Sequence, residues 1–351
     1  MSSVPPGTES PVDPRQRVAP PAPSNPPAQD GNPQDQDGQN PPAPGNLTAV
    51  RDRVRARVVG RERELDLVLA AVAAGRDILL EGPPGTSKTT ILKAITSEWD
   101  IPLVFVEGNA DLTPAKLVGH HNPARVLKED YSPDNFTDGP LLQAMKSGGF
   151  LYLEELNRAP DDTLNTLLTA MADRRITVPR AGTVIAQPTF RVIASMNPYD
   201  NIGTTRLSTS VHDRLCRLAI TYQDEQAERG IVALRATVPG IDPGLYGQLS
   251  ADAVALTRAT RAHQDIRQGS SVRGAIDLTL VTGALFALNG TVFQERVYQE
   301  TVYQETVYDA MTVALSGRIF LDETIVATPE QVLRQIWEDH FILNPAAAQP
   351  G

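Results

Sequence analysis

Apolar residues follow two kinds of pattern along the chain. Five short apolar runs are typical of buried strands. These runs cover residues 77–81, 103–107, 150–154, 191–196 and 216–221. The segments between them place apolar residues at helical spacing, as at Leu65, Val68, Leu69 and Val72. Strands that alternate with helices indicate a parallel sheet covered on both faces, so we predict an α/β domain over residues 49–225.

Only helical patterns follow residue 222. Four stretches have apolar residues at helical spacing. These stretches are 223–236, 250–266, 271–288 and 329–343. We therefore predict that the strands end at residue 222 and that a smaller helical domain covers residues 226–343.

The two ends of the chain differ in composition from the rest. Residues 1–48 contain 13 of the 29 prolines and few apolar side chains. Such a segment has too little apolar surface to offset the entropy lost on ordering, so we predict that it is disordered, and likewise residues 344–351. The N-terminal segment is either a solubilising spacer or a proline-rich docking motif.

A short tandem repeat occupies residues 292–311, with the copies VFQER, VYQET, VYQET and VYDAM. Its period of five matches neither a helix nor a strand, so successive Val-Tyr pairs rotate around a helix and form no single face. The repeat is either a duplication in a tolerant helix or loop, or a binding ridge.

Charge and composition narrow the class of protein. The 351 residues include 32 basic and 42 acidic side chains, a net charge of −10 that argues against a protein coating nucleic acid. The only cysteine, Cys216, cannot form an internal disulfide and is expected to be a packing residue. No apolar run reaches the roughly 20 residues needed to span a bilayer, and the first ten residues lack the features of a signal peptide. We expect a soluble, cytoplasmic protein.

The motif GPPGTSKT, residues 82–89, carries the strongest chemical signal. It lies between a predicted strand and a predicted helix, where glycines let backbone N–H groups surround a phosphate at the positive end of the helix dipole. Lys88 would reach the β- and γ-phosphates, and the Thr89 hydroxyl would hold Mg²⁺. Ser87 stands where the strict motif has glycine and would be strained if its φ is positive. The alternative is an ordinary Gly/Pro turn.

A pair of carboxylates ends the strand at 150–154. Glu154 would hold Mg²⁺ through water, although it is one methylene longer than the usual Asp, and Glu155 would polarise the attacking water. Asn197 follows the strand at 191–196 and could orient that water. A solvated strand edge and an Asn-Pro turn are the alternatives.

Other residues carry weaker signals. Arg214, Arg217 and Arg273 would be ordinary surface arginines without the motifs above. His120 and His121 are neighbours on one backbone and have no other ligand at metal spacing, so we assign them a structural or solvent-exposed role.

Taken together, these segments resemble the AAA+ ATPases and, within them, the MoxR family. The resemblance covers about residues 55–343. It rests on VVGRERELDLVL, GPPGTSKT, FLYLEELNRAPDDTLNTLLTAM, RVIASMNP and SVRG. The sequence around EELNRAPDD and NPYDNIGTTRLSTSVHDRLCRL is most similar to the CoxD-like branch, which is linked to maturation of carbon-monoxide dehydrogenase.

The resemblance implies a five-stranded parallel AAA+ P-loop core followed by an α-helical lid, with Mg²⁺ and ATP bound at a subunit boundary. It assigns Glu155 as the water-activating residue, Asn197 as sensor 1, Arg214 as the finger acting on the next subunit, and Arg273 as sensor 2. Arg217 is the alternative finger. Thr89 and Glu154 would hold the metal. The nucleotide-binding residues would be Gly60, Arg61, Gly82, Pro83, Pro84, Gly85, Thr86, Ser87, Lys88, Thr89 and Thr90.

The resemblance also implies an ATPase ring, a hexamer, that remodels a client protein. The partner would be a von Willebrand A-type adaptor and the client a molybdenum or copper oxidoreductase, contacted by residues 111–140 and by a hairpin at 174–188. Three alternatives stay open: a nucleotide-gated scaffold with little turnover, a relative serving gas vesicles or another complex, and a DNA-acting motor, which the acidic charge disfavours.

Overall fold

The computed structural model describes residues 47–129, 131–198, 207–289 and 300–343. The predictions for residues 1–46, for the first part of the repeat at 292–299 and for residues 344–351 lie outside the described residues. Helix α1 (Leu47–Arg55) begins two residues before the predicted start of the folded core at residue 49.

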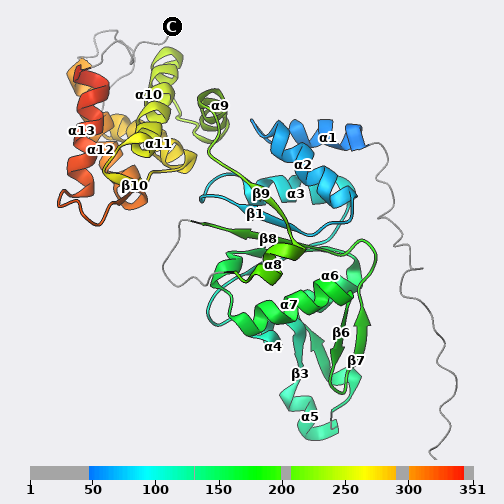
Figure 1. The fold of residues 1–351 in the computed structure, drawn as a ribbon. Coiled ribbons are helices and arrows are strands. Elements are labelled where there is room, and N and C mark those ends of the chain that lie inside the picture. The colour runs from blue at the N-terminus through cyan, green and yellow to red at the C-terminus, as the bar shows by residue number, and fades with distance from the viewer. Residues whose placement is uncertain (1–46, 130, 199–206, 290–299, 344–351) are drawn as a thin grey trace, which may run out of the picture. The chain divides into compact units, whose positions relative to one another are not determined.

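A five-stranded parallel sheet forms the centre of the first domain (Figure 1). The strands are β1 (Ile78–Glu81), β2 (Leu103–Glu107), β5 (Phe150–Glu154), β8 (Arg191–Met196) and β9 (Cys216–Ala219). Their order is β2-β5-β8-β1-β9, and every neighbouring pair is parallel. The predicted α/β class is confirmed, and the phosphate-loop strand β1 lies between β8 and β9.

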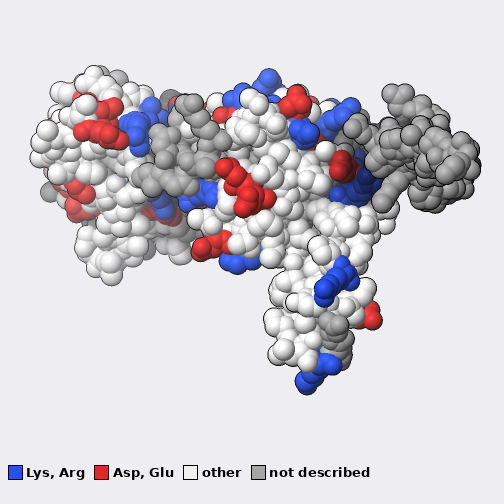
Figure 2. All heavy atoms as spheres, turned by 60° about the horizontal axis from the view of Figure 1, so that its bottom comes forward, with Lys and Arg blue, Asp and Glu red and all other residues white. Residues whose placement is uncertain are grey.

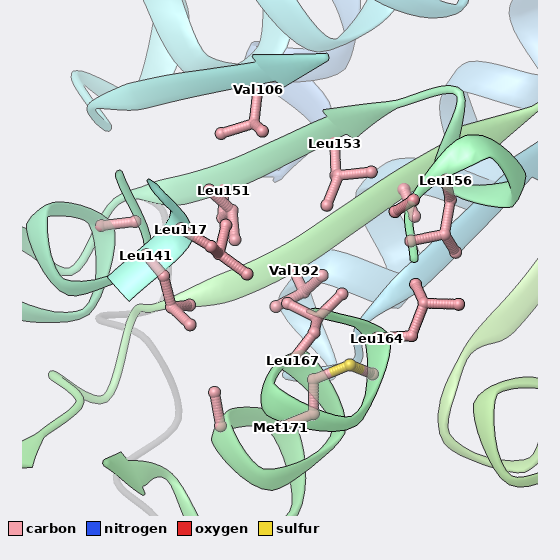
Figure 3. Packing of buried hydrophobic residues seen from close by; sticks show 14 of the residues in the cluster. Val106, Leu117, Leu141, Leu151, Leu153, Leu156, Leu164, Leu167, Met171 and Val192 are labelled. Atoms are coloured by element: carbon pink, nitrogen blue, oxygen red, sulfur yellow. The ribbon is translucent and has the colours of Figure 1, made fainter. Parts of the chain in front are cut away.

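Alternation along the strands divides the core into two layers. In β1, Leu79 packs with helices α6 (Pro140–Ser147) and α7 (Asp161–Asp173), whereas its two neighbours pack with α2 (Glu62–Ala73) and α3 (Lys88–Trp99). Figure 3 shows the first layer, where side chains from β5 and β8 meet the leucines of α7. This period of two is what a sheet buried on both faces requires.

Short elements extend one end of the α/β domain. Helix α4 (Pro114–Val118) leads into the pair β3 (Gly119–His121) and β4 (Phe136–Asp138), with α5 (Pro123–Glu129) and the 3₁₀ turn η1 (Pro133–Asn135) between them. The hairpin expected within 174–188 is present as β6 (Arg175–Val178) and β7 (Gly182–Ile185). The His121 ring packs edge-on against Phe136.

The C-terminal helical region, which we call the helical domain, contains five α-helices among the described residues. They are α9 (Glu225–Arg235), α10 (Pro243–Ala262), α11 (Val272–Leu288), α12 (Glu300–Leu315) and α13 (Pro329–Glu338). The prediction that strands end at residue 222 is wrong, because β10 (Ile266–Gln268) and β11 (Phe320–Leu321) form a small antiparallel pair. Strands of two or three residues carry no measurable periodicity in the sequence.

The described part of the repeat is helical. Residues 300–311 lie in α12, where Tyr303 is buried against Phe286 and Phe341. The Tyr303 hydroxyl donates to Asp252 Oδ2 at 2.6 Å, and His340 Nε2 lies 2.8 Å from Asp252 Oδ1. The repeat therefore contributes at least one side chain to the core of the helical domain.

Candidate functional site

The phosphate loop joins β1 to α3 and holds two residues at positive φ. Gly85 has φ 75°, and a Cβ there would collide with the Ser271 side chain at the start of α11. Ser87, the residue just before α3, has φ 66°. The positive φ that would strain a serine at this position is therefore present, at a cost of roughly 1–2 kcal/mol for an L-residue.

Lys88 is folded back under the loop. Its Nζ donates to the carbonyls of Gly82 and Pro83, both at 2.8 Å. Burial lowers the pKa of Lys88 to about 8, and the nearby Glu154 carboxylate opposes only part of this shift. The ammonium is thus held beside the loop by two of the loop's own carbonyls.

A hydroxyl cluster lies beside the loop at the carboxyl ends of the strands. Thr89 Oγ1 donates to Glu154 Oε1 at 3.3 Å, as the sequence-based pairing of these residues requires. Tyr152 Oη lies 3.2 Å from Thr89 Oγ1, 3.1 Å from Ser195 Oγ and 3.4 Å from Glu154 Oε1. Burial raises the pKa of Tyr152, so its hydroxyl keeps its proton. Sequence reasoning did not include Tyr152 or Ser195.

The donor set of this cluster fits Mg²⁺. Hydroxyl and carboxylate oxygens are the hard ligands that Mg²⁺ prefers, and it commonly takes one or two of them together with substrate phosphates and water. Within the described ranges, no group of three or more His, Cys, Asp or Glu side chains is arranged to hold a metal ion. Thr89 and Glu154 supply such oxygens here and would hold a metal in company with a bound nucleotide.

Glu155 follows β5 in a left-handed conformation, with φ 55°. Its carboxylate is paired with Arg158 at 3.1 Å. Gly108, after β2, donates its amide to the Glu154 carbonyl at 2.7 Å, and a Cβ there would collide with the Glu155 carbonyl. Asn197 comes directly after β8, at the same edge of the sheet, so the structure places Glu154, Glu155 and Asn197 at adjacent strand ends.

A cavity of about 390 Å³ adjoins the phosphate loop, within the range of ligand pockets. Its lining combines apolar side chains with three arginines. The lining residues are Arg57, Val58, Val59, Gly85, Ser87, Thr90, Ile231, Leu234, Arg235, Val272, Arg273 and Ile276. The predicted sensor Arg273 thus shares a cavity with the phosphate loop, and apolar residues are available for a base.

The arrangement around Gly60 and Arg61 differs from a simple pocket lining. Val58 and Val59 line the cavity, while the buried Arg61 guanidinium pairs with Glu64 at 2.9 Å and donates to the Thr221 carbonyl at 2.7 Å. Gly60 packs against Ala227 of α9. These two residues connect the loop before α2 with the start of the helical domain.

The two candidate finger arginines have different surroundings. Arg214 ends helix α8 (Thr209–Arg214) and donates to the Ser210 carbonyl at 3.1 Å, with its side chain exposed. Arg217 lies on β9 and is ion-paired with Glu81, which raises its pKa. Neither arginine lines the cavity described above. A residue that acts on a neighbouring subunit does not have to line the cavity of its own subunit.

The chain is similar to one family model and to several known proteins. Residues 77–215 match the family model described as an AAA domain of the dynein-related subfamily. A similar protein is an uncharacterised protein of Staphylococcus epidermidis, 29% identical over 207 residues that cover 58% of this chain and 77% of that protein. Another is the gas vesicle ATPase GvpN of Ancylobacter aquaticus, 26% identical over 270 residues, or 71% of this chain and 73% of that one.

Among solved structures, a candidate ATPase from Cytophaga hutchinsonii aligns with a TM-score of 0.45 and 23% identity, covering 84% of this chain and 94% of that one. The family match covers β1, the phosphate loop and the strand ends at Glu154 and Asn197. Residues 77–215 are therefore similar to an AAA domain, and a helical region follows them. None of the helices in the described residues is long and apolar enough to cross a bilayer.

Proposed function

We propose that this protein is a MoxR-type ATPase that uses hydrolysis of Mg²⁺-bound ATP to remodel a client protein. One observation carries the proposal: Arg273 of the helical domain lines one cavity with the loop residues Gly85 and Ser87. Lys88 and the Thr89–Glu154 pair lie beside the same loop. A nucleotide bound there would contact both domains, so loss of its terminal phosphate would change the contact that Arg273 makes.

The residues divide the chemistry between them. The loop amides and Lys88 would bind the phosphates, and Thr89 with Glu154 would hold Mg²⁺, which neutralises phosphate charge when bound. Glu155 would accept the proton of the attacking water after leaving its pairing with Arg158. Asn197 would orient that water, and Arg214 of a neighbouring subunit would complete the site in a ring.

Phosphate release measured with Mg²⁺ tests this assignment. We expect turnover in the unmodified protein, a loss of about 10²–10⁴-fold in Glu155→Gln with ATP still bound, and loss of binding in Lys88→Ala. Arg214→Ala should bind ATP but not turn it over, and mixing with Lys88→Ala subunits should restore turnover. Equal turnover in Glu155→Gln and the unmodified protein would favour the nucleotide-gated scaffold, which the strained Ser87 and the long Glu154 side chain make a real alternative.

The finer part of the proposal concerns the client. We infer a CoxD-like role with a von Willebrand A-type adaptor and a molybdenum or copper oxidoreductase, in the cytoplasm, with a hexameric ring as the working form. Tagged Glu155→Gln recovered from native cells with Mg²⁺ and ATP should retain these proteins, whereas Lys88→Ala should not. A ring recovered without either protein would contradict the metalloenzyme role.

The similarity to a gas vesicle ATPase favours a second candidate, in which the same machinery serves gas vesicle assembly. Gas vesicle proteins in the same capture experiment would support it. On the face drawn in Figure 2, acidic and basic side chains of the described residues are interspersed, unlike the continuous basic field that a DNA-acting motor needs.

A further inference from the structure

Tyr152 occupies an unusual position for a tyrosine. Its ring is fully buried in the apolar layer with Ile78, Leu80 and Phe150, where phenylalanine would fill the same space. Burying a hydroxyl costs about 1–3 kcal/mol unless it is hydrogen-bonded. Among the described residues, the polar atoms within hydrogen-bond distance of this hydroxyl belong to Thr89, Glu154 and Ser195, all at the site edge.

The strand pattern explains why the hydroxyl reaches the site. Tyr152 and Glu154 are two residues apart on β5, so both side chains lie on the face of the sheet that α3 covers. Phe105, opposite Tyr152 on the edge strand β2, packs against the ring with 5.8 Å between centroids. The hydroxyl is therefore held from the ring side and can move little.

Charge sets the direction of the hydrogen bonds. A carboxylate only accepts, so Thr89 and Tyr152 must each point a proton at Glu154 Oε1. The one proton of Tyr152 is then used, so Ser195 is the donor in its contact with Tyr152, and the 3.2 Å contact between the Thr89 and Tyr152 oxygens carries no proton. Because Thr89 donates its proton in a hydrogen bond to Glu154, the lone pairs of the Thr89 oxygen face away from the carboxylate. This is the orientation that a cation requires.

We propose that Tyr152 is a positioning residue for the metal-binding pair Thr89 and Glu154, and that it connects this pair through Ser195 to β8, the strand that precedes Asn197. The inference rests on the proposed function. It also explains how a glutamate can stand where a shorter carboxylate is usual. The extra rotatable bond of Glu154 adds conformations that must be restricted, and the Tyr152 hydroxyl restricts them.

The test uses Mn²⁺ in place of Mg²⁺ and full-length protein carrying Glu155→Gln, so that ATP is bound without turnover. Mn²⁺ affinity of the ATP-loaded protein is measured by electron paramagnetic resonance, and ATP affinity is measured separately in EDTA. Adding Tyr152→Phe should lower the affinity for Mn²⁺ about tenfold, because loss of a partner behind a metal ligand commonly has an effect of this size. The ATP affinity in EDTA should stay within about twofold. Ser195→Ala should weaken Mn²⁺ less, in the same direction.

Tyr303→Phe is the matched control, because it also removes a buried tyrosine hydroxyl that donates to a carboxylate. It should leave Mn²⁺ affinity unchanged. Unchanged Mn²⁺ affinity in Tyr152→Phe, or an equal loss of ATP affinity in EDTA, would overturn the positioning role. Failure of the parent protein to bind ATP in EDTA would instead overturn the proposed function, and the two failures are distinguishable.

Discussion

Tyr152 in the α/β domain and Tyr303 in the helical domain are both buried, and both donate to a carboxylate. The Tyr303–Asp252 bond is 2.6 Å long, and Asp252 is 2% exposed with His340 as a second partner. The Tyr152–Glu154 bond is 3.4 Å long, and Glu154 is partly exposed beside the phosphate loop. The same chemical pair thus serves stability where it is sealed from water and positions a side chain where it is open.

The largest effect that separates the two pairs should come from removing the carboxylates. Asp252→Ala leaves the buried Tyr303 hydroxyl and the partly buried His340 without their acceptor, so the free energy of unfolding should fall by about 3–5 kcal/mol. Glu154→Gln keeps a partly exposed polar group in place and should change it by less than about 0.5 kcal/mol. Urea denaturation measures both. Equal losses would remove the distinction between the two pairs.

A pH titration should sharpen the comparison next. Bound phosphates favour the charged form of Lys88, whose pKa is about 8 in the free protein. ATP affinity should therefore be flat below pH 8 and fall above it, by up to about tenfold per pH unit. Tyr303 in the helical domain should add no such pH dependence, because burial raises the pKa of its phenol above the ordinary tyrosine value.

The free energy of unfolding should depend on pH in the opposite direction. Between pH 8 and the ordinary lysine pKa of 10.5, the unfolded chain binds more protons at Lys88 than the folded one, so this residue's contribution to stability rises with pH. Lys88→Arg is the control for binding, since arginine stays charged throughout. A slope in Lys88→Arg equal to that of the unmodified protein would show that another group is responsible.

Removal of single hydroxyls should have a smaller effect on stability. Tyr303→Phe should lower the free energy of unfolding by about 1–2 kcal/mol, because Asp252 keeps His340 as a partner. Tyr152→Phe should lower it by less, because Glu154 retains Thr89 as a donor and is partly open to water. Urea denaturation of the two variants in parallel checks the order, and a larger loss in Tyr152→Phe would reverse the interpretation.

The smallest expected effect is a gain. Ser87→Gly relieves a positive φ at the phosphate loop and should raise the free energy of unfolding by up to about 1 kcal/mol, net of the entropy that glycine loses. Ser97→Gly, within helix α3, is the matched control and should lower it by a similar amount. Thermal unfolding of both variants measures the difference in sign, and a loss in Ser87→Gly would show that the serine side chain has a stabilising contact.

Much of this arrangement could be predicted from the sequence, for identifiable reasons. Four of the five strands were found because each is a short apolar run beside a glycine or proline, whereas the run at 216–221 has only its apolar residues as a signal. Lys88, Thr89 and Glu154 were found because their spacing is characteristic. The pair β10–β11 is too short to give a signal. The pairing of Arg61 with the Thr221 carbonyl joins residues far apart in the sequence, which no local pattern encodes.

Tyr152 is an intermediate case. Its place two residues before Glu154 on a predicted strand already put both side chains on one face, so its proximity to the metal-binding pair could have been deduced. The sequence could not show that Ser195 is also a partner of the Tyr152 hydroxyl. Ser195 comes from β8, and only the pairing of β5 with β8 brings its hydroxyl to Tyr152.

The close approach of Gly108 to the Glu155 carbonyl has a consequence for how this protein can vary. A methyl group at position 108 would push on the peptide that carries Glu155 and would leave the hydrophobic layers and the phosphate loop as they are. A lineage that accepted alanine there would keep the sheet and its covering helices, with Glu155 displaced from its place. The placement of Glu155 is thus inherited partly through a residue that has no side chain of its own.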